Sequence, residues 1–182
     1  EAGHRKIGVL CIRLDRTPNN GPVSAERLRT AKMHVQRSRI EGALAVLAEA
    51  GISQDNVPIV ERHINDQDNS RSAAEELLDA HPELTAVICT VDSMALAVAD
   101  VVEGRGGMIP RDLSVTGFDG IPQAVNRGIV TVRQPSKDKG RSSGEMLASN
   151  IEQTHNEHTG RIKKRGADTG ATRILLETSV MD

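Results

Sequence analysis

Short apolar runs alternate with longer stretches of helical periodicity through the first two thirds of the chain. Each run holds aliphatic residues between polar or turn-forming ones, which is the pattern of a buried strand. Four strands are therefore predicted, at 6–12, 57–60, 84–90 and 113–116. Between them, apolar residues at three- and four-residue spacing predict helices over 25–50 and 93–103, and a further helix around Leu77 and Leu78.

Glycine, proline and one polar pair mark where these helices begin and end. Gly51 stands where the first helix should end, and Pro82 closes the second. Ser72 and Glu75 have the spacing of a capping box, which predicts that the second helix starts near Ser72. The stretch 15–24 is rich in Pro, Asn and Gly and is expected to be a loop.

The pattern changes after residue 128. A short strand is predicted at 129–132, an amphipathic helix at 136–151, a polar linker at 154–170 and a last strand at 173–180. Strands and helices that alternate as they do before residue 128 indicate βαβ units. The expected fold class is α/β, with a doubly wound parallel sheet and helices on both of its faces.

Composition shapes the expected core and cellular compartment. Phe118 is the only aromatic residue, so the core is expected to consist of Leu, Ile, Val and Ala. Cys11 and Cys89 lie in predicted strands, and two cysteines in 182 residues do not make a disulfide framework. We expect buried free thiols and hence a reducing, cytoplasmic location. Because no apolar run approaches the ~20 residues of a membrane span, no membrane partner is expected.

Polar residues that follow predicted strands are the candidates for a ligand site. In parallel sheets, ligands bind where the strands reach their carboxyl ends. Asp92, Asp119 and Gln134 hold such positions, and Arg37 and Arg39 begin the regular part of the first helix. An arginine and a carboxylate that converge on one cleft can hold vicinal hydroxyls or a carboxylate, since one donates hydrogen bonds and the other accepts them.

Several of these residues also have a purely structural interpretation. Asp92 precedes a helix and can serve as its N-cap, and Asp119 before a glycine can be a turn residue. Arg39 on a helix can be solvated or ion-paired. The sequence leaves these alternatives open.

Patterns typical of catalysis or metal binding are incomplete. Ser136 and Lys139 match a Ser-x-x-Lys nucleophile pattern, but the companion motifs of that class are absent. His155 and His158 lack a third ligand. The stretch 66–77 begins like a calcium loop without its central Gly and closing Glu. We therefore expect no enzyme, no cofactor and no metal site.

The residues around the fourth strand resemble the signature of the LacI/GalR family of bacterial transcriptional regulators. Residues 86–120 read AVICTVDSMALAVADVVEGRGGMIPRDLSVTGFDG and resemble that family's Asp-x-Met-Ala helix followed by Ser-Val-x-Gly-Phe-Asp. Residues 3–7 are similar to its Gly-His-Arg-Arg-Ile entry, 39–42 to its Arg-x-x-Gly helix, and 131–135 to its Thr-Thr-Val-x-Gln-Pro run. The resemblance covers almost the whole chain, and 154–170 is its least similar part.

The resemblance implies a periplasmic-binding-protein-like fold, with the second subdomain nearly complete and the first mostly missing. It places the second subdomain at 1–126, a segment that returns to the first at 127–153, and a linker with the closing strand at 154–182. Effector contacts carried over position by position fall on Arg39, Asp119 and Gln134. Two departures stand out: Val91 replaces an Asn common in sugar-binding members, and Gly120 replaces a common acidic residue.

The implied function is that of the effector-sensing and dimerising core of a repressor. A small molecule (a sugar, a nucleoside or a related metabolite) would close two subdomains and change DNA binding by a helix-turn-helix that this sequence lacks. DNA is expected only through that domain, because a net charge of −2 gives no electrostatic footprint for nucleic acid. A homodimer is expected through 93–103 and 121–127, where apolar residues spread around the predicted helix. The alternatives are a solute-binding protein of a transport system on the same fold, and an enzyme on a doubly wound sheet.

Overall fold

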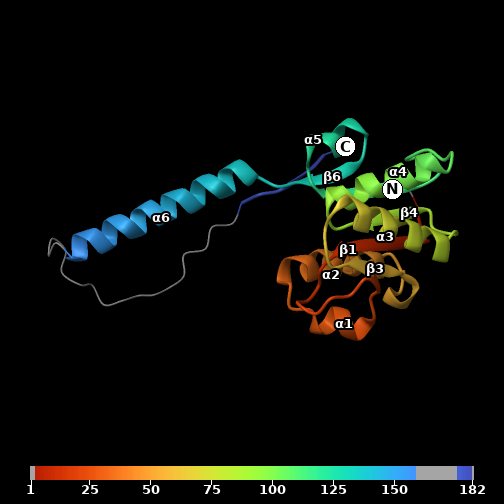
Figure 1. Cartoon of the computed structure of the whole chain (residues 1–182), viewed down its shortest axis with the longest axis horizontal. Helices are drawn as coiled ribbons and strands as arrows, with labels where there is room; N and C mark the ends of the chain where they lie inside the picture. Colours follow the sequence, from red (N-terminus) through yellow and green to blue (C-terminus); the bar gives the residue numbers. More distant parts are fainter. Residues whose placement is uncertain (1–2, 159–175, 182) are drawn as a thin grey trace. The chain divides into compact units, whose positions relative to one another are not determined.

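A largely parallel sheet forms the centre of the fold. The computed structural model describes residues 3–158 and 176–181. Over these residues seven strands form one sheet in the order β2–β3–β1–β4–β5–β6–β7 (Figure 1). Neighbours from β3 to β6 pair in parallel, whereas β2 pairs antiparallel with β3. The strands are β1 (Ile7–Ile12), β2 (Gly21–Pro22), β3 (Ile59–Arg62), β4 (Ala86–Cys89), β5 (Ser114–Asp119), β6 (Val130–Arg133) and β7 (Ser179–Met181).

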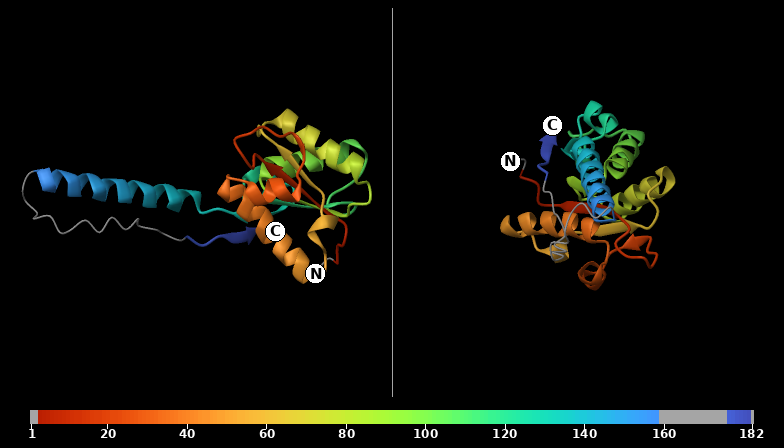
Figure 2. Two further views of the ribbon diagram at one scale, coloured as in Figure 1. Left: turned by 90° about the horizontal axis from the view of Figure 1, so that it is seen from below. Right: turned by 90° about the vertical axis from the view of Figure 1, so that its left-hand side faces the viewer.

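Helices pack on both faces of this sheet. In chain order the helices of the described residues are α1 (Ala25–Thr30), α2 (His34–Glu49), the 3-10 helix η1 (Gln54–Asn56), α3 (Gln67–Ala80), α4 (Asp92–Gly104), α5 (Pro122–Asn126) and α6 (Ser136–His158), the last of which belongs to a second compact unit. α3 and α4 lie on one side of the sheet and α2 on the other (Figure 2). The α/β fold with a doubly wound, predominantly parallel sheet is therefore confirmed.

Alternate side chains of β1, β3 and β4 supply two separate apolar clusters. In β1, Leu10 enters the cluster under α3 and α4, whereas Val9 and Cys11 enter the cluster under α2. This alternation follows from the period of two residues in a strand. Both clusters are aliphatic, as predicted, and both cysteines are free and buried. Burial raises the pKa of the Cys11 and Cys89 thiols well above the ordinary range.

The chain divides into two compact units. One comprises Glu1–Arg133 with Val180–Asp182, and the other Gln134–Ser179. The second unit contains α6, which continues through His158, beyond the predicted end of this helix at 151. The predicted linker at 154–170 is wrong for 154–158, which are helical, and its remainder lies outside the described residues. The predicted subdomain limits at 126 and 153 stay a prediction.

Other expectations about single elements need correction. The helix predicted over 25–50 is two helices, because Ala31, Lys32 and Met33 leave the helical path between α1 and α2. The capping box at Ser72 is wrong. α3 begins five residues earlier, where the Asp66 side chain accepts a hydrogen bond from the backbone N–H of Asn69.

The strand limits also differ from the expectation. The predicted loop at 15–24 contains the short strand β2, and β5 continues through Asp119 rather than ending at 116. The closing strand predicted at 173–180 is described only from residue 176, and β7 begins at Ser179. No helix among the described residues is both long and apolar enough to cross a membrane.

Candidate functional site

The side chain of Arg39 reaches from α2 across the carboxyl ends of β4 and β5. One terminal nitrogen donates to the carbonyl oxygen of Thr90 at 2.6 Å, and the other lies 3.6 Å from Oδ1 of Asp119. The guanidinium carbon stands 3.8 Å from the centre of the Phe118 ring, which is a cation–π geometry. Burial lowers the pKa of Arg39, while the Asp119 carboxylate acts in the opposite sense. The structure thus brings Arg39 and Asp119 together, as the strand-end rule predicts.

Asp119 is held in an unusual backbone conformation at the end of β5. Its φ is 129°, a region that residues other than glycine rarely adopt. Strain of this kind gathers at ligand sites. The next residue, Gly120, has a φ of 72°, and a Cβ placed on it would lie 2.7 Å from the Cα of Arg133. Close packing on β6 therefore accounts for glycine at position 120.

Asp92 has a structural task at the same edge. Its side chain is 1% exposed, Oδ1 accepts a hydrogen bond from the Thr131 hydroxyl at 2.6 Å, and Oδ2 accepts one from the backbone N–H of Ile121 at 2.8 Å. The carboxylate thereby ties the start of α4 to β6 and to the loop before α5. The N-cap interpretation of Asp92 is wrong, because Val91 is the N-cap residue and Asp92 the first residue of the helix. A direct effector contact from Asp92 stays a prediction.

The other two candidates, Arg37 and Gln134, make contacts of their own. Arg37 donates to the carbonyl oxygen of Ala31 at 3.2 Å and stands 3.4 Å from Glu41, one turn further along α2. Two residues apart on a helix, Arg37 and Arg39 point in nearly opposite directions. Gln134 belongs to the second unit, where its side-chain oxygen accepts a hydrogen bond from Lys139.

The residues that follow β3 also have polar groups at the carboxyl ends of the strands, but the sequence analysis does not name them as candidates. Directly after β3, the backbone N–H of His63 donates to the Asn20 side chain at 2.9 Å. Asn65 accepts a hydrogen bond from the Ser93 hydroxyl at 2.9 Å, which joins this loop to α4. The rule that selected residues after the other strands also applies to β3. It would have included 63–65 if the predicted strand had not ended at 60. Among the described residues, no group of three His, Cys, Asp or Glu side chains is placed to hold a metal ion.

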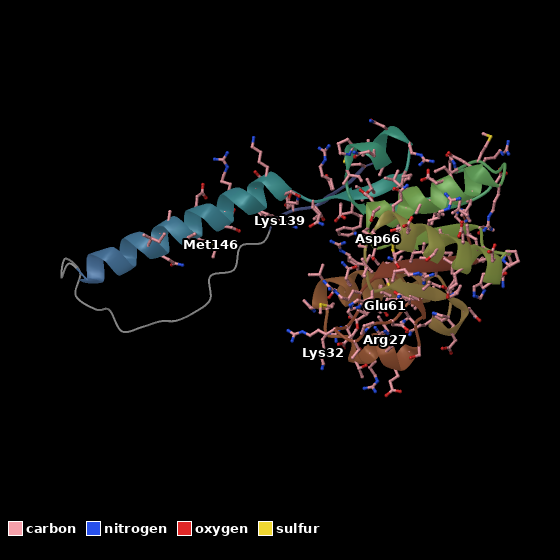
Figure 3. All side chains as sticks on the ribbon, viewed as in Figure 1. Arg27, Lys32, Glu61, Asp66, Lys139 and Met146 are labelled. Atoms are coloured by element: carbon pink, nitrogen blue, oxygen red, sulfur yellow. The ribbon has the colours of Figure 1, made fainter. Side chains whose placement is uncertain are left out.

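A buried carboxylate fixes the segment that connects β1 to α2, which we call the strap (residues 13–33). Glu61, 0% exposed, accepts hydrogen bonds from the Leu14 N–H at 2.7 Å and the Asn19 amide at 3.1 Å. Arg27 donates to its two oxygens at 2.5 and 2.9 Å (Figure 3). Three parts of the strap therefore converge on one side chain of β3. The strap leads directly into α2, which carries Arg39.

The carbonyl oxygen of Leu14 completes the attachment of the strap. It accepts hydrogen bonds from the N–H groups of Lys32 at 3.1 Å and Met33 at 3.0 Å, just before α2 begins. Sequence patterns did not single out Glu61, because an acidic residue directly after an apolar run normally signals the exposed end of a strand.

The fold and this edge place the chain in a known class. Residues 1–166 match the family described as periplasmic binding protein-like domain, and the chain belongs to that family. The HTH-type transcriptional regulator IpsA of Corynebacterium glutamicum is 49% identical over 155 residues, which cover 85% of this chain and 43% of the regulator. The chain is thus an effector-binding core of the LacI/GalR kind, as its motifs predict.

Solved structures agree with this assignment. A LacI-family regulator from Corynebacterium glutamicum superposes with a TM-score of 0.81 at 50% identity, covering 84% of this chain and 45% of that one. The structure titled transcriptional regulator CelR-cellobiose complex gives a TM-score of 0.67 at 26% identity, covering 98% and 46%. The chain spans less than half the length of each of these regulators.

Proposed function

We propose that this chain senses a small, uncharged, hydroxyl-bearing effector at the Arg39–Asp119 pair and thereby controls DNA binding by another part of a longer regulator. A sugar, a nucleoside or a related metabolite has the required chemistry, because each hydroxyl can donate to a carboxylate and accept from a guanidinium. The two side chains also neutralise each other's charge, which favours a neutral ligand over an anion. The cellobiose complex of a related regulator supports this class of effector.

The juxtaposition of Arg39 and Asp119 at the carboxyl edge carries the proposal. Their side chains are 13% and 35% exposed, so both are partly withdrawn from water yet reachable. The missing amide at position 91 does not weaken this pair, since Val91 belongs to the core cluster under α3 and α4. In this proposal, Arg39 and Asp119 bind the hydroxyl groups of the effector. Gln134 is its third proposed contact.

Regulation rather than transport is the favoured role on the same fold. The relatives reported above are named as transcriptional regulators, which favours this role over solute uptake. In the proposal, effector binding closes two subdomains and changes the spacing of DNA-binding domains in a homodimer. No acid–base pair or nucleophile stands out at the Arg39–Asp119 edge, and catalysis forms no part of the proposed role.

A thermal-shift panel on the full-length regulator tests the proposal. The panel contains cellobiose, ribose, adenosine and glucose 6-phosphate. We expect one of the neutral compounds to raise the melting temperature, because a ligand that binds only the folded state stabilises it. We expect Asp119→Asn to remove that rise while the ligand-free melting temperature falls by at most about 4 °C, as the loss of one partly exposed ion pair allows. A rise produced by the phosphate alone, or one that survives in Asp119→Asn, would contradict it.

A further inference from the structure

A hollow lies at the opposite end of the parallel strands from Arg39. It has a volume of about 530 Å³, which is in the range of small-molecule sites, roughly 300–1,000 Å³. Lys6 lines it directly before β1, and Val57 and Leu84 line it two residues before β3 and β4. These are the amino ends of parallel strands. The hollow is therefore separate from the Arg39–Asp119 pair and goes beyond the function proposed above.

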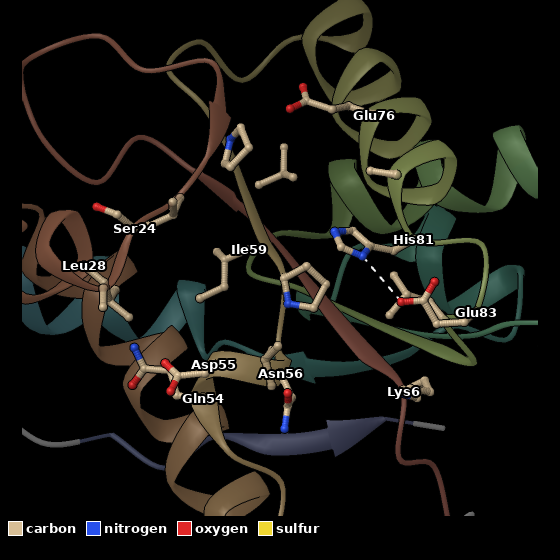
Figure 4. Close-up of a pocket in the computed structure, with 18 residues that line it drawn as sticks. Lys6, Ser24, Leu28, Gln54, Asp55, Asn56, Ile59, Glu76, His81 and Glu83 are labelled. Carbon is tan, nitrogen blue, oxygen red and sulfur yellow. Dashed lines mark ion pairs between the residues drawn. The ribbon is translucent and has the colours of Figure 1, made fainter.

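The hollow has an apolar floor supplied by different elements. Leu28 of α1 and Ile59 of β3 line it (Figure 4), as does Leu84 of the loop before β4, and the three are 4%, 7% and 7% exposed. These side chains also belong to the two apolar core clusters. The apolar surface of the hollow is therefore formed without a ligand. An apolar body placed there removes additional apolar surface from water, which is favourable.

The rim of the hollow is mainly acidic. The carboxylates of Asp55, Glu76 and Glu83 line it together with the ammonium of Lys6 and the imidazole of His81 (Figure 4). His81 stands 3.4 Å from Glu83. The pKa of Glu83 is lowered, first by a backbone hydrogen bond and further by His81 and Lys6, so this carboxylate is ionised at neutral pH. The three carboxylates face the Lys6 ammonium and the Arg62 guanidinium that is paired with Glu76, which leaves one net negative charge at the rim when His81 is neutral.

One carboxylate oxygen on this rim is placed to accept a further hydrogen bond. Oε2 of Glu76 accepts a hydrogen bond from Arg62 at 2.6 Å. Oε1 accepts none from the described residues, and it lies 3.5 Å from the point where Gly21 would carry a Cβ. The glycine therefore leaves room beside this oxygen. A charged hydrogen-bond donor is the partner that an ionised carboxylate binds most strongly.

We propose that this hollow binds a protonated amine carried on a compact apolar body. The apolar floor receives the body, and the carboxylates of the rim receive the ammonium group. An anion of the same shape is repelled by the same rim. Charge complementarity to Asp55, Glu76 and Glu83, joined to a preformed apolar floor, is what selects this class of ligand.

Three probes of nearly equal shape test the choice of charge. Benzylamine, benzyl alcohol and benzoate are titrated separately into the ¹⁵N-labelled chain at neutral pH, and amide shifts are followed. We expect benzylamine to shift the amides of Asn56, His81 and Glu83, and to bind about tenfold more tightly than benzyl alcohol, as one charge-assisted hydrogen bond provides. Benzoate should leave these amides unmoved. Equal binding of benzoate and benzylamine, or no shift with benzylamine, would overturn the proposal.

A matched pair of variants locates the binding. Ala80 lies on the rim, and Ala80→Phe fills the hollow with a side chain that needs no core space. Ala48 is also exposed, lies on α2 and does not line the hollow, so Ala48→Phe is the control. We expect the benzylamine shifts to vanish in Ala80→Phe and to persist in Ala48→Phe, with both variants folded by thermal melting.

Two further variants separate this proposal from that for the effector site. Asp55→Asn should weaken benzylamine binding severalfold, because it removes one rim charge. Arg39→Ala should leave it unchanged, since Arg39 lies at the other end of the parallel strands. Shifts that survive in Ala80→Phe, or that disappear in Arg39→Ala, would mean that the amine binds elsewhere.

Discussion

Gly117 in β5 shows how closely the site is built around the Asp92 carboxylate. A Cβ on Gly117 would lie 2.1 Å from Oδ1 of Asp92, which is already held by Thr131. We expect Gly117→Ala to cost about 1–3 kcal/mol of unfolding free energy, the usual range for overpacking. Urea denaturation measures this change.

Gly42 provides the control for this substitution. It lies within α2 and has no atom within 4 Å of its Cβ position. Gly42→Ala should therefore stabilise the chain by up to about 1 kcal/mol, because alanine is the better helix former. Equal effects of the two alanines would contradict the close approach of Asp92 to β5.

Glu61 offers a second prediction at the residue scale. Glu61→Gln removes the charge opposite Arg27, whose side chain is only 20% exposed. We expect a loss of about 3 kcal/mol in unfolding free energy, at the lower end of the range for breaking a buried pair. The strap amides of Lys32 and Met33 should also exchange with deuterium faster, because the strap loses its anchor.

The matched control for this prediction is Glu76→Gln. Glu76 pairs with Arg62 at a similar distance, 2.6 Å against 2.5 Å, but its side chain is 35% exposed. Arg62 is 6% exposed but keeps its hydrogen bonds to the Ser72 hydroxyl and to the carbonyl oxygen of Glu61, and water reaches the Glu76 end of the pair, so a smaller cost of about 1–2 kcal/mol is expected. A larger effect in Glu76→Gln than in Glu61→Gln would refute the role assigned to Glu61.

Single residues were the least predictable level from the sequence. The rule of strand ends selected Arg39 and Asp119, and the structure brings them together. The same rule selected Asp92, whose oxygens serve the protein itself. Whether a carboxylate after a strand faces a ligand or a neighbouring loop depends on tertiary partners such as Thr131, which lies 39 residues away in the chain. A local pattern contains no information on that partner.

At the scale of elements, the start of α3 gives a pH-dependent prediction. A hydrogen bond from the backbone of Asn69 lowers the pKa of Asp66 below its ordinary value of 3.8. The folded state therefore favours the ionised carboxylate. This contribution to stability is complete above the ordinary pKa and is lost as the pH falls through the lower, folded-state pKa.

Asp66→Asn isolates this contribution, since an amide caps the helix at every pH. The stability of the natural chain relative to Asp66→Asn should fall as the pH is lowered below about 4, as the linkage of protonation to folding requires. Asp68→Asn removes a carboxylate from the same turn but leaves the cap in place, and serves as the control. A relative stability of Asp66→Asn that is flat across this pH range would count against the cap.

The order and type of the main elements could be predicted from the sequence, but several limits could not. The break at 31–33 between α1 and α2 follows from hydrogen bonds to Leu14, a long-range contact that interrupts a locally helical pattern. Ser72 and Glu75 have the spacing of a capping box, but α3 begins earlier, with Asp66 as its N-cap residue. The two-residue strand β2 depends on pairing with β3 and is too short to produce a periodic signal.

At the scale of the whole molecule, the apolar residues of α4 that suggest a dimer are buried within the chain. Met94 and Val98 of α4 are 0% exposed and Val101 is 3% exposed within the chain itself. Apolar residues around α4 are thus already covered by the sheet and by α3 and α5, and they do not identify a subunit surface. Because Val98 is buried, Val98→Asp would unfold the chain rather than test an interface. Self-association through 93–103 and 121–127 stays a prediction, which sedimentation equilibrium of the natural chain can test.

The central claim is that Arg39, and not its neighbour Arg37, binds the effector. Calorimetric titration of the full-length regulator with the hit from the thermal-shift panel tests it most directly, in the natural sequence, in Arg39→Ala and in Arg37→Ala. We predict that Arg39→Ala loses about 2–5 kcal/mol of binding free energy, as truncating a partly buried charged contact does. Arg37→Ala should bind within about twofold of the natural protein, because its side chain is directed to Ala31 and Glu41. Unchanged affinity in Arg39→Ala, or an equal loss in both variants, would contradict the account.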